Sequence, residues 1–166
     1  RVVAAREVSL ADLKEMKDHV DIEIESFVHG SMCISYSGRC LLSNYMTGNR
    51  DANRGQCSQS CRWKYSLVES NRPGEYYPIE EDEHGTYIFN SKDLCLIHRI
   101  PDLYEAGIDS LKIEGRMKSV HYCATVAKVY RTAIDTYLKE GKDWYVRPEW
   151  IAELEKISHR PYTDGF

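Results

Sequence analysis

Four of the six cysteines in this 166-residue chain fall within residues 25–63, and a fifth, Cys95, follows after a gap. The four are Cys33, Cys40, Cys57 and Cys61. Thiolates are soft ligands, and four that converge select an iron–sulfur cluster or zinc. The clustering therefore predicts a metal or cluster site, with independent buried or surface thiols as the alternative.

The sixth cysteine, Cys123, has a different setting. It lies on the apolar face of a predicted long helix, so we expect it in the core. The other spacings do not match the paired CxxC pattern of a two-knuckle zinc site. Six cysteines are too few for a disulfide scaffold, and nothing else in the chain suggests secretion. Cytosolic thiols or metal ligands are therefore favoured over disulfides.

Charge is unevenly distributed around the cysteines. Residues 31–66 carry five basic side chains against one acidic, a net charge of +4, whereas residues 75–84 are acidic and predict a turn between strands. A basic region around the cysteines would suit an anionic ligand or RNA phosphate. We expect Arg50, Arg54 and Arg62 to contact RNA phosphate; the alternatives are solvated surface or charge balance for a thiolate cluster.

Hydrophobic periodicity predicts alternating strands and helices. Strands are expected at residues 2–7, 21–28 and 110–114, and helices after the N-cap Ser9 and over 120–139 and 148–157. An antiparallel hairpin is expected between residues 63–69 and 87–89, after a cysteine-rich loop at 29–62. The pattern predicts one α/β domain over residues 1–166, either about half of a (β/α) TIM-like barrel of about 250 residues or a small three-layer domain.

Barrels of this kind place their chemistry in loops after the carboxyl ends of strands. Glu25, Glu114 and Arg116 occupy such positions and are our candidate catalytic residues, with Lys118 as a further anion contact. The alternatives are that Glu25 orients the cysteine-rich loop and that Glu114 and Arg116 form a salt bridge.

Specific motifs accompany these residues. The segments ESFVHGSMC (25–33) and GRCLLS (38–43) resemble the signature of peptidase family U32, the collagenase-like peptidases. RGQCSQSCRW, SKDLCLI and IPDLYEAGIDSLKIEGRMKS are also similar to the family, so the resemblance covers essentially the whole chain. It implies that a barrel-forming N-terminal portion is missing here, which agrees with a chain that does not begin with methionine.

The resemblance also implies a function. The most similar branch hydroxylates the wobble uridine of tRNA with a prephenate-derived supply, and carries a 4Fe–4S cluster on four cysteines. By position the ligands are Cys33, Cys40, Cys57 and Cys95, with Cys61 as a possible alternate and zinc as an alternative metal. We expect a cytoplasmic protein that binds tRNA or other RNA and a prephenate-like anion, and no membrane span, because the apolar runs are short.

Two other functions remain open at this point. One is collagenase-like proteolysis, although the chain has neither an HExxH zinc motif nor a GxSxG elbow. Cys33 and His29 could be a nucleophile and its base, but their spacing of four residues at the end of a strand does not predict that the two side chains meet. The other is a non-catalytic binding module stabilised by a structural cluster.

Overall fold

The structure is a computed structural model that describes residues 1–63, 65–68, 70–78 and 92–165. The chain divides into two compact units, which we describe separately. The sheet unit comprises Arg1–Met32 and Lys92–Phe166, and the cysteine unit comprises Cys33–Ser91. The mixed α/β class predicted from the sequence is confirmed.

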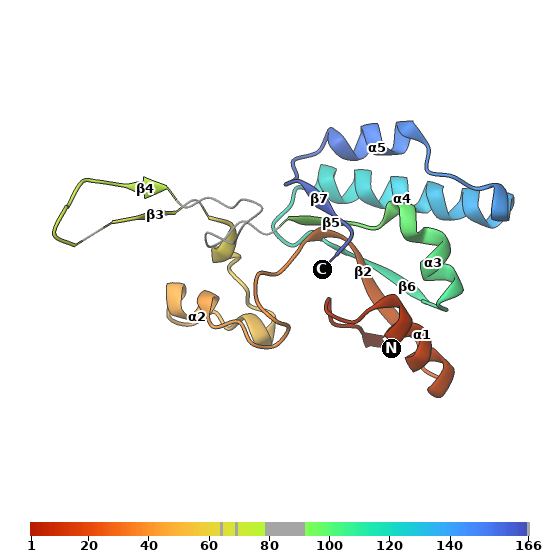
Figure 1. Ribbon diagram of the computed structural model, residues 1–166, viewed down its shortest axis with the longest axis horizontal. Coiled ribbons are helices and arrows are strands. Elements are labelled where there is room, and N and C mark those ends of the chain that lie inside the picture. The colour runs from red at the N-terminus through yellow and green to blue at the C-terminus, as the bar shows by residue number, and fades with distance from the viewer. Residues whose placement is uncertain (64, 69, 79–91, 166) are drawn as a thin grey trace. The chain divides into compact units, whose positions relative to one another are not determined.

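The sheet unit is built on a five-stranded sheet (Figure 1). Strand β2 (Ile24–Ser31) pairs in parallel with β1 (Val2–Val3) and with β6 (Ser110–Glu114). Strand β5 (Asp93–Cys95) pairs antiparallel with the end of β2, and β7 (Tyr162–Thr163) runs parallel to β5. The sequence pattern predicted the three parallel strands but did not predict β5 or β7.

The helices of this unit begin and end at local signals. Helix α1 (Leu10–His19) begins at Ser9, which forms a capping box with Asp12. Helix α3 (Ile100–Glu105) follows η3 (Ile97–Arg99) and has a proline in its first turn. The long α4 (Val120–Glu140) is capped by Ser119, and η4 (Gly141–Asp143) and α5 (Pro148–Glu155) follow. The three helices predicted from the sequence are therefore present, as α1, α4 and α5.

The main core lies between the sheet and α4, with α5 on the other side of α4 (Figure 1). It contains Val28 of β2 and a row of α4 side chains that recurs at helical spacing: Tyr122, Val126, Val129, Tyr130 and Ala133. A smaller cluster of Ala4, Leu13 and Ile24 holds α1 against the sheet. Cys123 packs partly against the main core, as the sequence predicted.

The close approach of β2 and β6 depends on Gly30. Its φ is +104°, and a Cβ at this position would lie 2.2 Å from the carbonyl oxygen of Glu114. The pairing of the two strands is irregular between Phe27 and His29. Glycine is therefore required here for both conformation and space.

The cysteine unit has more regular structure than the predicted loop. It contains α2 (Leu42–Thr47), η1 (Ala52–Arg54) and η2 (Ser60–Arg62), followed by a hairpin of β3 (Ser66–Leu67) and β4 (Tyr77–Pro78). Strand β3 pairs with β4. Residues 87–89, the predicted hairpin partner, lie outside the described part. The acidic run is described only as far as residue 78.

Candidate functional site

Glu25 lies near the start of β2, and not after its carboxyl end as the sequence predicted, on a charged face of the sheet. Its carboxylate accepts hydrogen bonds from Ser110 Oγ at 2.8 Å and pairs with Lys112 Nζ at 3.2 Å, both on β6. The hydrogen bond from Ser110 and the ion pair with Lys112 lower the pKa of Glu25. Glu25 is therefore an ionised acceptor that joins two strands, and its side chain is mostly buried.

A cationic and aromatic cluster adjoins Glu25, formed by Phe27 of β2, Lys112 of β6 and Arg6, which follows β1. The Arg6 guanidinium lies 3.9 Å from the centre of the Phe27 ring, and the Lys112 ammonium lies 5.3 Å from it. Arg6 also pairs with Glu114 at 3.8 Å. Sequence reasoning did not select Arg6 or Phe27 as site residues, although Arg6 follows the first strand and so occupies the kind of position that led to the other candidates.

Glu114 and Arg116 do not form the side-chain salt bridge considered from the sequence. The carboxylate of Glu114 accepts a hydrogen bond from the backbone N–H of Arg116 at 3.0 Å and pairs with Arg6 instead. Arg116 is exposed. These contacts therefore connect Arg6 and Glu114 to each other and Lys112 to Glu25, and they leave the Arg116 side chain exposed.

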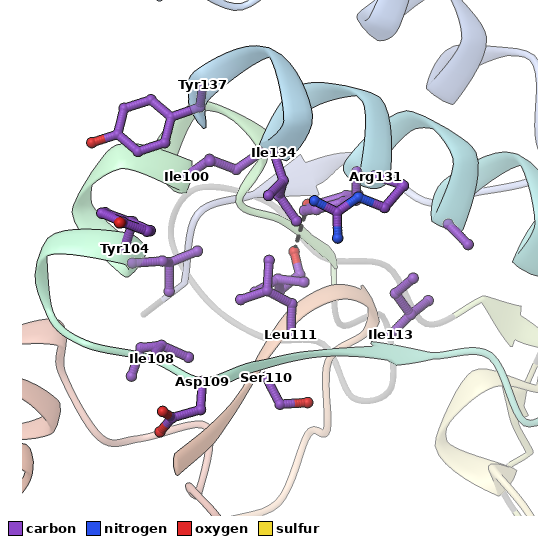
Figure 2. Close-up of a pocket in the computed structure, with 14 residues that line it drawn as sticks. Ile100, Tyr104, Ile108, Asp109, Ser110, Leu111, Ile113, Arg131, Ile134 and Tyr137 are labelled. Carbon is purple, nitrogen blue, oxygen red and sulfur yellow. Dashed lines mark hydrogen bonds between the residues drawn. The ribbon is translucent and has the colours of Figure 1, made fainter. Parts of the chain in front are cut away.

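Among the described residues, two cavities of the sheet unit bear on the site. One, of about 310 Å³, is lined by residues that include Arg6, Phe27 and Arg99, close to the ends of β1 and β2. The other, of about 410 Å³, lies between β6, α3 and α4 and is mainly apolar, with Leu111, Ile113 and Ile134 in its wall (Figure 2). Only the first is lined by a residue of the charged face.

His29 occupies a buried aromatic cage. Three tyrosine rings, those of Tyr122, Tyr130 and Tyr162, lie 5.4–6.0 Å from its ring. Burial lowers the pKa of His29 to about 4, so the imidazole is neutral at physiological pH. Nδ1 lies 3.4 Å from Tyr130 Oη, and Nε2 has no hydrogen-bond partner among the described residues.

Cys95 is buried on β5, where it pairs in register with His29. Burial raises the pKa of the Cys95 thiol, while hydrogen bonds with the Ile97 backbone and the Tyr130 side chain lower it. The same Tyr130 hydroxyl accepts a hydrogen bond from the Leu96 N–H at 3.0 Å and donates one to the Val28 carbonyl at 2.8 Å. Cys95 is therefore held in a rigid part of the sheet unit.

The four cysteines of the cysteine unit are free thiols that are neither fully buried nor fully exposed. Burial raises the pKa of Cys61, and the neighbouring thiols of Cys33, Cys57 and Cys40 raise it further, while Arg62 lowers it. The four sulfurs are thus close enough to interact electrostatically. Within the described ranges, no three His, Cys, Asp or Glu side chains converge tightly enough to hold a metal ion.

Polar contacts within the unit fix the segment around Cys57. The buried Ser43 Oγ of α2 accepts a hydrogen bond from Ser58 N at 2.9 Å. Arg50 donates to the carbonyl oxygens of Gln56 at 3.1 Å and Cys57 at 3.4 Å, and Gln59 N donates to Cys57 Sγ at 3.3 Å. An amide N–H directed at sulfur suits a thiolate ligand, so this donor set fits a thiolate-bound cluster.

The predicted RNA contacts have different surroundings. Arg54 is highly exposed, with Asp51 3.6 Å away, whereas Arg50 is engaged with the backbone around Cys57. Arg62 is half-buried. Lys118 lies in the sheet unit, where its ammonium pairs with the buried Asp93 at 3.3 Å. None of the helices in the described ranges combines the length and apolarity needed to cross a bilayer.

Comparison with known proteins identifies a family and several relatives. A model described as peptidase family U32 matches residues 1–166. A tRNA hydroxylation protein of Bacillus subtilis is 52% identical over the whole chain, which covers 39% of that relative. A tRNA hydroxylation protein of Escherichia coli is 42% identical, again over the whole chain and 45% of the relative.

A third relative acts on a different RNA by name. This 23S rRNA 5-hydroxycytidine synthase of Escherichia coli is 35% identical over the whole chain, which covers 25% of it. No solved structure matches the chain. The chain therefore spans less than half the length of each of these relatives.

Proposed function

Because this chain belongs to peptidase family U32, and because relatives named for tRNA hydroxylation match it over its whole length, we propose that it is part of a protein that hydroxylates the wobble uridine of tRNA. The observation that carries the proposal is the 52% identity to one such relative over all 166 residues. Action on tRNA in turn suggests a cytoplasmic protein.

The cysteines would supply the cofactor site in this proposal. Cys33, Cys40, Cys57 and Cys95 would hold a 4Fe–4S cluster, with Cys61 as the alternate ligand. Such a cluster, when bound, supplies one-electron transfer. The chain's own contribution is to hold the Cys57 segment through Arg50 and Ser43, and to direct the Gln59 N–H at the Cys57 sulfur.

The charged face of the sheet would bind the small anionic reactant. Arg116 is exposed and can form paired hydrogen bonds with a carboxylate such as those of a prephenate-like anion. Glu114 would position Arg6, and Glu25 would position Lys112, beside the bound anion, because each carboxylate contacts that basic side chain. The cavity beside Arg6 and Phe27 offers space for a small molecule.

We further propose that both units belong to one domain of a longer protein with a TIM-like barrel. Three features of the sheet unit support this: β1, β2 and β6 are parallel, α4 covers one face, and among the described strands β6 pairs only with β2. The apolar cavity beside β6 would then receive further elements of that longer protein (Figure 2).

The proposal is tested with the full-length protein and a strain that lacks its gene. Mass spectrometry of tRNA from the deletion strain should show loss of hydroxyuridine, restored by the wild-type gene and not by one encoding Cys57→Ser. Unchanged hydroxyuridine in the deletion strain would contradict the function. Anaerobic iron and sulfide analysis tests the cofactor separately, since a preparation that contains only zinc would exclude the cluster.

A further inference from the structure

The cysteine unit carries several exposed aromatic rings. The side chains of Tyr36, Tyr45 and Tyr76 are 66%, 83% and 71% exposed, and Trp63 is also exposed. In the described part of the larger sheet unit, Tyr104 and Tyr145 are the exposed tyrosines, while Tyr122 and Tyr130 are buried. Water-exposed rings at this density indicate a surface that is covered by a partner.

The packing of the cysteine unit itself directs the Tyr45 side chain outward, together with that of Leu41. In α2, Ser43 is buried and hydrogen-bonded to Ser58, which turns that side of the helix inward. Leu41 and Tyr45 lie one turn apart, because the Tyr45 N–H donates to the Leu41 carbonyl at 2.9 Å. Both side chains are largely exposed. Their exposure is therefore a consequence of how α2 is anchored.

Positive charge accompanies the rings of Tyr36, Tyr45 and Trp63, whereas Tyr76 lies in the acidic run of residues 75–84. The Arg39 guanidinium lies 5.9 Å from the centre of the Tyr36 ring, and Arg54 is 84% exposed at the end of η1. Residues 33–63 contain four arginines and a single acidic residue, Asp51. A surface that combines exposed rings with excess positive charge complements a polyanion with accessible ring faces.

We propose that this surface binds unpaired bases of single-stranded RNA, which stack on Tyr36 and Tyr45 while Arg39 and Arg54 contact the phosphates. Aromatic side chains and cations together are the usual way in which proteins hold single strands, because every base has a face on which a ring can stack. Bases within a duplex are already stacked on one another, so a duplex offers only its phosphates. The inference rests on the proposed action on RNA and assigns the contact surface.

The experiment measures RNA affinity of the full-length protein by fluorescence anisotropy. The probes are a labelled single-stranded RNA and a fully paired hairpin of matched length. Tyr45→Ser and Tyr36→Ser should each weaken binding to the single strand by on the order of tenfold, with little effect on the hairpin. Arg54→Gln should lower the affinity for both probes and reduce the salt dependence of binding.

Tyr145→Ser is the matched control, because Tyr145 is 61% exposed and an arginine, Arg147, lies 4.6 Å from its ring centre, yet it belongs to the sheet unit. It should leave both affinities unchanged. Circular dichroism and iron content should be equal in all variants, which separates a lost contact from misfolding.

Two results would overturn the inference while leaving the proposed function intact. One is an unchanged single-strand affinity in the Tyr36→Ser, Tyr45→Ser double variant when the wild type binds the probe. The other is an equal loss in the Tyr145→Ser control. If the double variant lost a co-purifying protein and kept its RNA affinity, the surface would be a protein interface and the inference would be wrong. Failure of the proposed function shows itself separately, as unchanged hydroxyuridine in the deletion strain.

Discussion

Lys118 and Asp93 form an ion pair in which the carboxylate is fully buried, with 3.3 Å between Nζ and Oδ2. The same ammonium donates to the Ser158 carbonyl at 2.9 Å, and Asp93 Oδ2 also accepts the Arg160 N–H at 3.2 Å. The pair therefore joins the loop after β6 to β5 and to the segment before β7. Lys118, expected from the sequence to contact an anion, is engaged inside the sheet unit.

Replacement of Lys118 by Met should destabilise the protein, because it removes the ammonium that lies 3.3 Å from the buried Asp93 carboxylate. We expect the free energy of unfolding to fall by about 2–3 kcal/mol. Urea denaturation of the full-length protein measures it, with Lys128→Met as the control, since Lys128 is exposed on α4. Equal stability of the two variants would show that the ion pair contributes little.

The buried His29 should make the protein less stable in acid. Its pKa is about 4 in the folded protein, below the ordinary value of 6.5, so the unfolded chain binds a proton more readily between those two values. The stability contribution is complete above pH 6.5 and is lost as the pH falls towards 4, by up to about 3 kcal/mol. Denaturation curves at intervals of pH should show this slope.

The slope is assigned with two substitutions. His29→Gln removes the titrating group and should flatten the curve between pH 6.5 and 4, whereas His121→Gln, at an exposed position on α4, should leave it as in the wild type. A wild-type slope that persists in the His29→Gln variant would assign the acid sensitivity to other groups.

Gly30→Ala should disrupt the pairing of β2 and β6. The new Cβ would lie 2.2 Å from the Glu114 carbonyl oxygen, and φ is +104°. We expect a loss of roughly 3–5 kcal/mol or failure to fold. Gly38→Ala is the control, because Gly38 has a φ of +78° with no atom within 4 Å of its added Cβ, and should cost about 1 kcal/mol. Thermal unfolding distinguishes the two, and a similar Tm would contradict the steric argument.

The cysteine substitutions should separate ligands from neighbours. Serine at position 33, 40, 57 or 95 should abolish iron binding in anaerobic protein, because each change removes a thiolate that the cluster requires. Cys123→Ser should retain iron, since Cys123 packs against the core and its Sγ lies 3.9 Å from the Gly115 carbonyl oxygen. Cys61→Ser should also retain it, and loss of iron in that variant would make Cys61 a ligand.

Much of the fold could be predicted because its signals are local. Ser9 and Ser119 cap helices whose apolar residues recur at helical spacing, and the strand at Ser110–Glu114 was predicted with its observed bounds. The cysteine motifs likewise lie within short stretches, so the sequence alone was enough to identify the family.

The tertiary structure decided which side chains meet. Tyr130 donates a hydrogen bond to the carbonyl of Val28, 102 residues earlier in the chain, and Arg6 rather than Arg116 pairs with Glu114. Strand β5 runs antiparallel to β2, so Cys95 lies opposite His29. Periodicity and capping depend on neighbours within a few residues. Contacts across a sheet depend on strand order and register, which those local patterns leave undetermined.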